Sequence, residues 1–163
     1  MMKSLNAMTA REIMTSPVAY VMTETPLKEV ANLLIERGIS ATPVLDDGGR
    51  LVGIVSEGDL VRRSPAGKKG RRSWWLDLFE PDSPRSEGLL NYLRGHGLRA
   101  KDVMTREVVS VGEETTVAEI AELLETRGIK RVPVVRNGKL TGIVSRANLL
   151  SLLARQMQTA GRR

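Results

Sequence analysis

The sequence contains RGISATPV at residues 37–44 and, later in the chain, RGIKRVPV at residues 127–134. Around these octapeptides, residues 13–60 align with residues 103–149 through a single gap at Gly48, and 22 of the 47 aligned positions are identical. A repeat of this length indicates a tandem duplication, in which residues 64–98 are inserted between the two copies.

Each copy predicts the element order β-α-β-β-α. A short β-rich piece, at residues 18–21 or 108–111, precedes a segment whose apolar residues recur at helical spacing. Gly38 and Gly128 follow these helices and are typical of a left-handed C-cap. Neither copy buries enough apolar surface alone, so we expect the two copies to pack on each other. The helical apolar residues are Leu27, Val30, Ala31 and Leu34 in the first copy and Val117, Ile120, Ala121 and Leu124 in the second.

The helix starts and the turns carry local signals. Thr116 and Glu119 have the spacing of a capping box, and Pro26 suits a first helical turn. The Asp47-Gly48 and Asn137-Gly138 dipeptides are typical of hairpin turns, because they supply positive φ angles. The predicted strands are residues 42–45 and 51–55 in the first copy and 132–135 and 140–144 in the second, and a last helix starts near residue 57 or 146.

Composition places the 163-residue chain among globular proteins. Apolar residues make up 41% and charged residues 27%, which argues against disorder and fits one domain or two half-sized ones. The absence of cysteine excludes disulfides and thiolate metal sites and favours a reducing compartment. No apolar run approaches the roughly 20 residues that span a bilayer, and the first residues lack a secretory signal, so we expect a cytoplasmic protein.

The net charge of +6 comes from one segment. Six basic residues and no acidic one lie between residues 62 and 72, and the 19 basic residues that remain equal the 19 acidic ones in number. Trp74 and Trp75 follow this run, and three interpretations stay open: packing over the core or a dimer interface, contact with an anionic membrane surface, and contact with single-stranded nucleic acid. Packing is the interpretation we favour. The lone His96 has no cysteine partners with which to form a metal site.

Each copy resembles a CBS domain, and the pair resembles a Bateman module. The residues that carry the resemblance are the Gly-Ile-x-x-x-Pro-Val stretch, at residues 38–44 and 128–134, and the Gly-Ile-Val-Ser junction, at residues 53–56 and 142–145. The insert, with its Arg-Arg-Ser-Trp-Trp-Leu segment, is also similar to that of bacterial CBS-pair proteins that continue into a BON domain.

The resemblance implies an α/β (α+β) fold, in which the two repeats pack as a pseudo-twofold pair with a partly helical insert. It also implies clefts between the repeats that bind AMP, ADP, ATP, S-adenosylmethionine or NAD-like ligands, and a disc-like homodimer. We therefore expect CBS repeats at residues 9–63 and 99–155, a basic, Trp-containing linker at residues 64–98, and flexible ends at residues 1–8 and 156–163.

In the first copy, the resemblance assigns the ribose diol of the ligand to Asp59. A carboxylate suits two neighbouring hydroxyls because it accepts a hydrogen bond from each. Ser56, at the helix start, would face ribose or phosphate oxygens, although Ser56 and Asp59 are also typical helix-capping residues. The adenine would be held by Val18, Ile39, Ser40, Ala41 and Pro43, and Thr15 would face a cleft or end a turn.

In the second copy, Asn148 stands where the resemblance places the ribose carboxylate, three residues after Ser145. An amide lacks the charge-assisted strength of a carboxylate, so we expect two unequal sites. This copy is richer in cations, because Lys130, Arg131 and Arg146 stand where the first copy has no basic residue. These side chains would reach phosphates of the ligand, or would be solvated surface charges.

Together these patterns predict a non-enzymatic regulatory module, since no catalytic motif is visible. It would need no cofactor or metal, would bind an adenosyl nucleotide as a regulatory ligand, and would signal to an unidentified protein by a conformational change. Two alternatives remain: a structural dimerisation or interaction module without a ligand, and nucleic-acid binding through residues 62–72. Nucleic acid and membrane are the less favoured partners.

Overall fold

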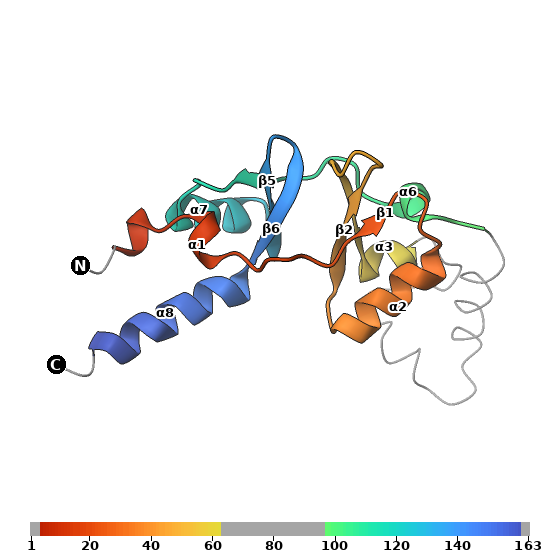
Figure 1. Ribbon diagram of the computed structural model, residues 1–163. Helices are drawn as coiled ribbons and strands as arrows, with labels where there is room; N and C mark the ends of the chain where they lie inside the picture. Colours follow the sequence, from red (N-terminus) through yellow and green to blue (C-terminus); the bar gives the residue numbers. More distant parts are fainter. Residues whose placement is uncertain (1–3, 63–96, 161–163) are drawn as a thin grey trace, which may run out of the picture. The chain divides into compact units, whose positions relative to one another are not determined.

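The computed structural model describes residues 4–62 and 97–160, which belong to two compact units. Unit 1 comprises Met1–Val18, Gly49–Leu51 and Val109–Arg163, and unit 2 comprises Ala19–Gly48 and Val52–Val108. The predicted α/β fold is confirmed, with the order β-α-β-β-α present twice (Figure 1). The linker predictions, including those for Trp74, Trp75 and His96, lie outside the described residues.

Unit 2 contains a three-stranded sheet in the order β1-β2-β3, with helices beside it (Figure 1). Helix α2 buries Leu27, Val30 and Leu34, and ends at Gly38, whose φ of 60° is the left-handed conformation expected of it. The strands are β1 (Val21–Met22), β2 (Ala41–Leu45) and β3 (Leu51–Ser56), and the helices are α2 (Leu27–Arg37), α3 (Glu57–Arg62) and α6 (Ala100–Val103).

Unit 1 has the same plan, with β5 parallel to β4 and antiparallel to β6. The predicted capping box is confirmed, since Thr116 N donates to Glu119 Oε2 at 2.8 Å and Glu119 N donates to Thr116 Oγ1 at 3.3 Å. The turn between β5 and β6 has Asn137 and Gly138 at φ of 53° and 76°, as the dipeptide predicts, whereas before β3 the positive φ, of 78°, is at Gly49 and not at Asp47-Gly48. The elements are η1 (Leu5–Ala7), α1 (Ala10–Ile13), β4 (Val111–Gly112), α7 (Val117–Thr126), β5 (Arg131–Arg136), β6 (Lys139–Ser145) and α8 (Arg146–Ala160).

The N-terminal segment is an integral part of unit 1. Ala10 N donates to Thr115 O at 2.8 Å, Thr15 N donates to Ile143 O at 2.9 Å, and Ala10 is completely buried in the core of the unit. In Figure 1, α1 accordingly lies near α7 and β6, although α1 precedes β1 in the sequence. The chain segment before the first repeat's sheet therefore completes the unit that holds the second repeat's sheet.

Unit 2 contains the corresponding segment from the second copy. Ala100 N donates to Thr25 O at 2.8 Å, and Thr105 N donates to Ile54 O at 2.9 Å. Ala100, Val103 and Met104 belong to the core of unit 2, together with residues of α2 and β2. In each unit, the segment that precedes the first strand of one copy thus packs with the sheet of the other copy, which the sequence alignment alone does not indicate.

Some details of the predicted elements are wrong. β1 and β4 are two-residue strands that begin at Val21 and Val111 rather than at residues 18 and 108. In unit 2, Ala19 O, two residues before β1, accepts a hydrogen bond from the side chain of Thr42 at 3.1 Å. Pro26 is the N-cap of α2 and lies one residue before the first helical turn in which it was predicted. Ala121, which was predicted on the apolar face of α7, is exposed, because it lies at the edge of that face.

Glu113 is a nearly buried carboxylate of unit 1, with 8% of its side chain exposed. Arg11 Nη2 lies 2.6 Å from Glu113 Oε2, and Arg136 Nη1 lies 3.6 Å from the same oxygen. The hydrogen bond from Arg11 lowers the pKa of Glu113 below its ordinary value and outweighs the effect of burial, which acts in the opposite direction. This ion pair therefore helps to hold α1 in unit 1.

Replacing Glu113 by Gln is expected to lower the stability of unit 1 at neutral pH. A carboxyl whose folded-state pKa is lowered stabilises the fold above its unfolded pKa of about 4.3, and this contribution is lost as the pH falls through the folded pKa. Urea midpoints of the wild type and Glu113→Gln should therefore differ at pH 7 and converge in acid. Glu114→Gln is the control, because Glu114 is 77% exposed and should change the midpoint little. A constant difference from neutral to acidic pH would contradict this role.

Candidate ligand-binding site

Ser56 and Asp59 of unit 2 lie where β3 passes into α3. Ser56 N and Ser56 Oγ both donate to Asp59 Oδ2, at 2.8 and 2.9 Å, and Asp59 N donates to Ser56 Oγ at 3.3 Å. The hydrogen bonds of a helix cap are thus present. Both bonds from Ser56 reach the same carboxylate oxygen, Oδ2. The half-buried Asp59 is therefore held at a fixed place at the junction.

Ser40 lies next to the same junction, because its carbonyl accepts from Glu57 N at 2.9 Å. Ile39 and Ala41, on either side of Ser40, are half-buried. Pro43 differs from them, since less than 2% of it is exposed and it belongs to the interior of the unit. Of the residues predicted around the adenine, Val18 belongs to unit 1, at the end of its first segment, whereas the others belong to unit 2.

Unit 1 has an equivalent junction between β6 and α8. Ser145 N and Ser145 Oγ donate to Asn148 Oδ1, both at 2.8 Å, and Asn148 N donates to Ser145 Oγ at 3.3 Å. Asn148 Nδ2 also donates to Thr15 Oγ1 at 3.3 Å. Asn148 therefore forms the same cap as Asp59, with an amide in place of the carboxylate.

The sequence does not predict the contact between Thr15 and Asn148, because this contact depends on the exchange of N-terminal segments. The Met-Thr pairs at residues 14–15 and 104–105 were the available signal, since they recur at equal positions of the repeat. In unit 2, Thr105 has the corresponding place and forms a backbone bridge with Ile54, as Thr15 does with Ile143 in unit 1. Thr15 of the first copy thus lies beside the sheet of the second copy, and Thr105 of the second copy lies beside the sheet of the first.

The three predicted cations of the second copy gather at the unit 1 junction. Arg131 is paired with Ser145 across the β5–β6 ladder, and Arg146 N donates to Lys130 O at 3.0 Å. Lys130 and Arg146 are exposed, and Arg131 is half-buried. Their presence beside Ser145 makes this junction basic, whereas the unit 2 junction has Ser40, Ala41 and Glu57 at the matching positions.

The described residues offer two further observations. Within residues 4–62 and 97–160, no three His, Cys, Asp or Glu side chains are grouped so that they could hold a metal ion. No helix in these two ranges combines the length and the apolar character that a membrane span requires.

Two copies of one α/β unit, each with a serine-based cap at the same junction, define the chain as a tandem-repeat protein. The family model for the CBS domain matches it at residues 10–66 and 100–155. The chain therefore belongs to the CBS-domain family and contains a CBS pair.

Known proteins of this family are similar over most of the chain. The uncharacterized protein MJ1426 of Methanocaldococcus jannaschii is 34% identical over 157 residues, which cover 90% of this chain and 91% of that protein. The solved CBS domain of a CBS domain-containing membrane protein from Sphaerobacter thermophilus has a TM-score of 0.71 and 36% identity, and the match covers 91% of this chain and 89% of that chain. The structure of CBSX2 from Arabidopsis thaliana in complex with AMP has a TM-score of 0.69 and 28% identity, and covers 92% and 98% of the two chains.

Proposed function

We propose that this CBS pair is a non-enzymatic regulatory module that binds an adenosyl nucleotide, with AMP as the first candidate, and passes a conformational change to a partner protein. Asp59 is the residue that holds the ribose, and Ser56, Ser40, Ala41 and Ile39 line the same site. The AMP complex of CBSX2 supports the choice of ligand. Signalling requires that the ligand favours one conformation of the protein over another.

The observation that carries the proposal is the pair of hydrogen bonds from Ser56 to Asp59 Oδ2. They hold the carboxylate at the start of α3, so that the group is oriented before a ligand arrives. A carboxylate that is already ordered loses little conformational entropy on binding, which favours affinity. A ribose diol is a suitable partner, because its two hydroxyls are adjacent donors.

Asp59→Asn is a sharp test, because the chain itself shows that Asn forms this cap. Asn148 accepts the same two hydrogen bonds from Ser145, at 2.8 Å each. The variant should therefore stay folded, and lose at most the roughly 1 kcal/mol that a charge at a helix start contributes. Binding of AMP, measured by isothermal titration calorimetry, is expected to weaken about tenfold or more, because a charge-assisted hydrogen bond becomes a neutral one.

Two results would contradict the proposal. One is the absence of any heat with AMP, ADP, ATP, NADH and S-adenosylmethionine. The other is equal AMP affinity for the wild type and Asp59→Asn, with both proteins folded by circular dichroism. A nucleotide that binds without involving Asp59 would require a different site.

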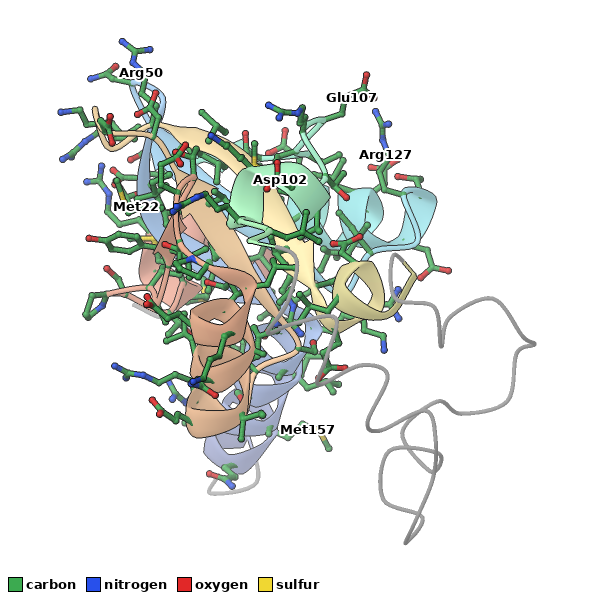
Figure 2. The ribbon with its side chains drawn as sticks, turned by 90° about the vertical axis from the view of Figure 1, so that its right-hand side faces the viewer. Met22, Arg50, Asp102, Glu107, Arg127 and Met157 are labelled. Carbon is green, nitrogen blue, oxygen red and sulfur yellow. The ribbon has the colours of Figure 1, made fainter. Side chains whose placement is uncertain are left out.

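The alternative of a structural dimerisation module has one observation in its favour. Leu150, Leu153 and Met157 of α8 are 66%, 47% and 76% exposed, and their spacing places them on one face of the helix. Figure 2 shows the Met157 side chain projecting from α8. A dimer in sedimentation analysis that forms without nucleotide, together with no response to any of the five ligands, would favour this alternative. Of the segment 62–72, through which the chain would bind nucleic acid, residues 63–72 lie outside the described residues.

A further inference from the structure

Met14 belongs to the N-terminal segment of unit 1 and packs directly on Gly142 of β6. If Gly142 had a Cβ atom, the nearest atom to it would be Met14 Sδ, followed by Met14 Cγ at 2.7 Å. The sulfur therefore occupies the space in which any other residue at this position would place its side chain. A glycine within a strand allows such a close approach. The thioether is thus part of the contact that joins the segment to the sheet.

The two methionines that recur in the repeat differ in their access to solvent. In unit 2, Met104 packs on Gly53 in the same way, because Met104 Sδ would be the nearest atom to a Cβ at Gly53. Only 7% of Met104 is exposed, whereas Met14 is half-buried. A small oxidant reaches a sulfur only where the side chain is accessible. The thioether of unit 1 is therefore the more reactive of the two.

An oxygen atom added to Met14 Sδ would find the neighbouring backbone donors already in use. The N–H of Met14 donates to Ala10 O at 2.8 Å, that of Thr15 donates to Ile143 O at 2.9 Å, and that of Ile143 donates to Thr15 O at 3.1 Å. Oxidation converts the apolar thioether into a polar, chiral sulfoxide. Because a buried acceptor without a donor is unfavourable, the sulfoxide opposes the contact on Gly142 that the thioether makes.

Thr15, the residue after Met14, connects this contact to the β6–α8 junction. Asn148 Nδ2 donates to Thr15 Oγ1 at 3.3 Å, and Thr15 forms the backbone bridge with Ile143. Displacement of Met14 would therefore also withdraw the hydroxyl that Asn148 contacts. The equivalent contact of unit 2 involves the buried Met104 and would stay intact.

We propose that Met14 is an oxidation site, and that its sulfoxide loosens the N-terminal segment from unit 1 while unit 2 stays intact. The oxidant is a peroxide. One oxygen atom of hydrogen peroxide is transferred to Sδ as the O–O bond breaks, the sulfur gives up two electrons, and the other oxygen leaves as water with both hydrogens. This oxidation site needs no ligand and is independent of the proposed nucleotide binding.

Peroxide titration of the full chain, followed by peptide mass spectrometry, measures the oxidation of each methionine. Met157, which is 76% exposed, should react first, Met14 next and Met104 last. Hydrogen exchange of the same samples should rise about tenfold or more in residues 109–145 as Met14 reacts, because a buried acceptor is left without a donor. Exchange in residues 19–48 should not change.

Substitutions separate Met14 from the other methionines. Met14→Leu keeps an apolar side chain of similar volume without sulfur, so its exchange should stay at its own untreated level at peroxide doses that oxidise Met8 and Met22. The matched control Met157→Leu removes an exposed sulfur and should lose protection as the wild type does. Met14→Gln, which introduces a polar amide without any oxidant, should raise exchange in residues 109–145, whereas Met157→Gln should not.

Three results would overturn the inference. Met14 that reacts no faster than Met104 would show that the sulfur is inaccessible. Equal losses of protection in Met14→Leu and the wild type, at the same peroxide dose, would place the cause at another methionine. Exchange that stays unchanged when Met14 is oxidised, or when it is replaced by Gln, would show that unit 1 tolerates a polar group on Gly142.

Discussion

Deletion of residues 1–18 is expected to destabilise unit 1 strongly and to leave the stability of unit 2 unchanged, although the deleted residues precede the first repeat's sheet. The segment supplies buried Ala10, the partly buried Met14 and backbone hydrogen bonds to Thr115 and Ile143. Removal of one large buried side chain costs about 2–5 kcal/mol, so the loss of the whole segment should lower the unfolding temperature of this unit by more than about 10 °C.

Hydrogen exchange detected by mass spectrometry distinguishes the two units. Faster exchange should be confined to residues 109–160, with protection unchanged in residues 19–48. A synthetic peptide of residues 4–18, added to the truncated chain, should restore protection. This result would show that the unit lacks this particular segment, and that the truncated chain is not unstable for another reason. Unchanged exchange in β5 and β6 would show that the segment is dispensable.

Gly142→Ala is the second change for which we expect a large loss of stability. A Cβ atom at this position would lie 2.7 Å from Met14 Cγ and 3.0 Å from Met14 Cβ. Met14 has little room to withdraw, because Thr15, the next residue, is bonded to Ile143 in both directions. Overpacking of this kind costs about 1–3 kcal/mol, which urea denaturation would measure.

Gly112→Ala is the matched control, because the nearest atom to a Cβ at Gly112 is Thr115 Oγ1 at 3.9 Å, an ordinary contact. The variant Gly142→Ala/Met14→Ala should be less destabilised than the sum of its single changes, since Met14→Ala removes part of the steric conflict. Additive effects, or equal losses for Gly142→Ala and Gly112→Ala, would exclude the close contact as the cause.

The sequence predicts the parts of the fold that depend on local chemistry. The left-handed glycines, the Thr116 capping box and the Asn137-Gly138 turn are each determined by a few neighbouring residues, and all three are confirmed. The lengths of β1 and β4 were wrong, because they depend on pairing with distant strands. The exchange of N-terminal segments is a tertiary feature and has no local signal.

In the candidate site, too, the sequence predicts the local features and not the tertiary contacts. The alignment of Asp59 with Asn148, and the cations near Asn148, are visible in the sequence. The contact between Thr15 and Asn148 is not, since it joins residues that the repeat pattern assigns to different copies. The roles of all these residues in binding a ligand stay predictions that the titrations described above would test.

The crossed arrangement of α1 and α6 also bears on how such a chain could arise. A lone ancestral repeat would have had its leading segment but no second sheet within the same molecule to receive it. Two molecules could satisfy these hydrogen bonds by donating their leading segments to each other, which is domain swapping between identical protomers. The intramolecular exchange found here is the single-chain counterpart of that swapped pair.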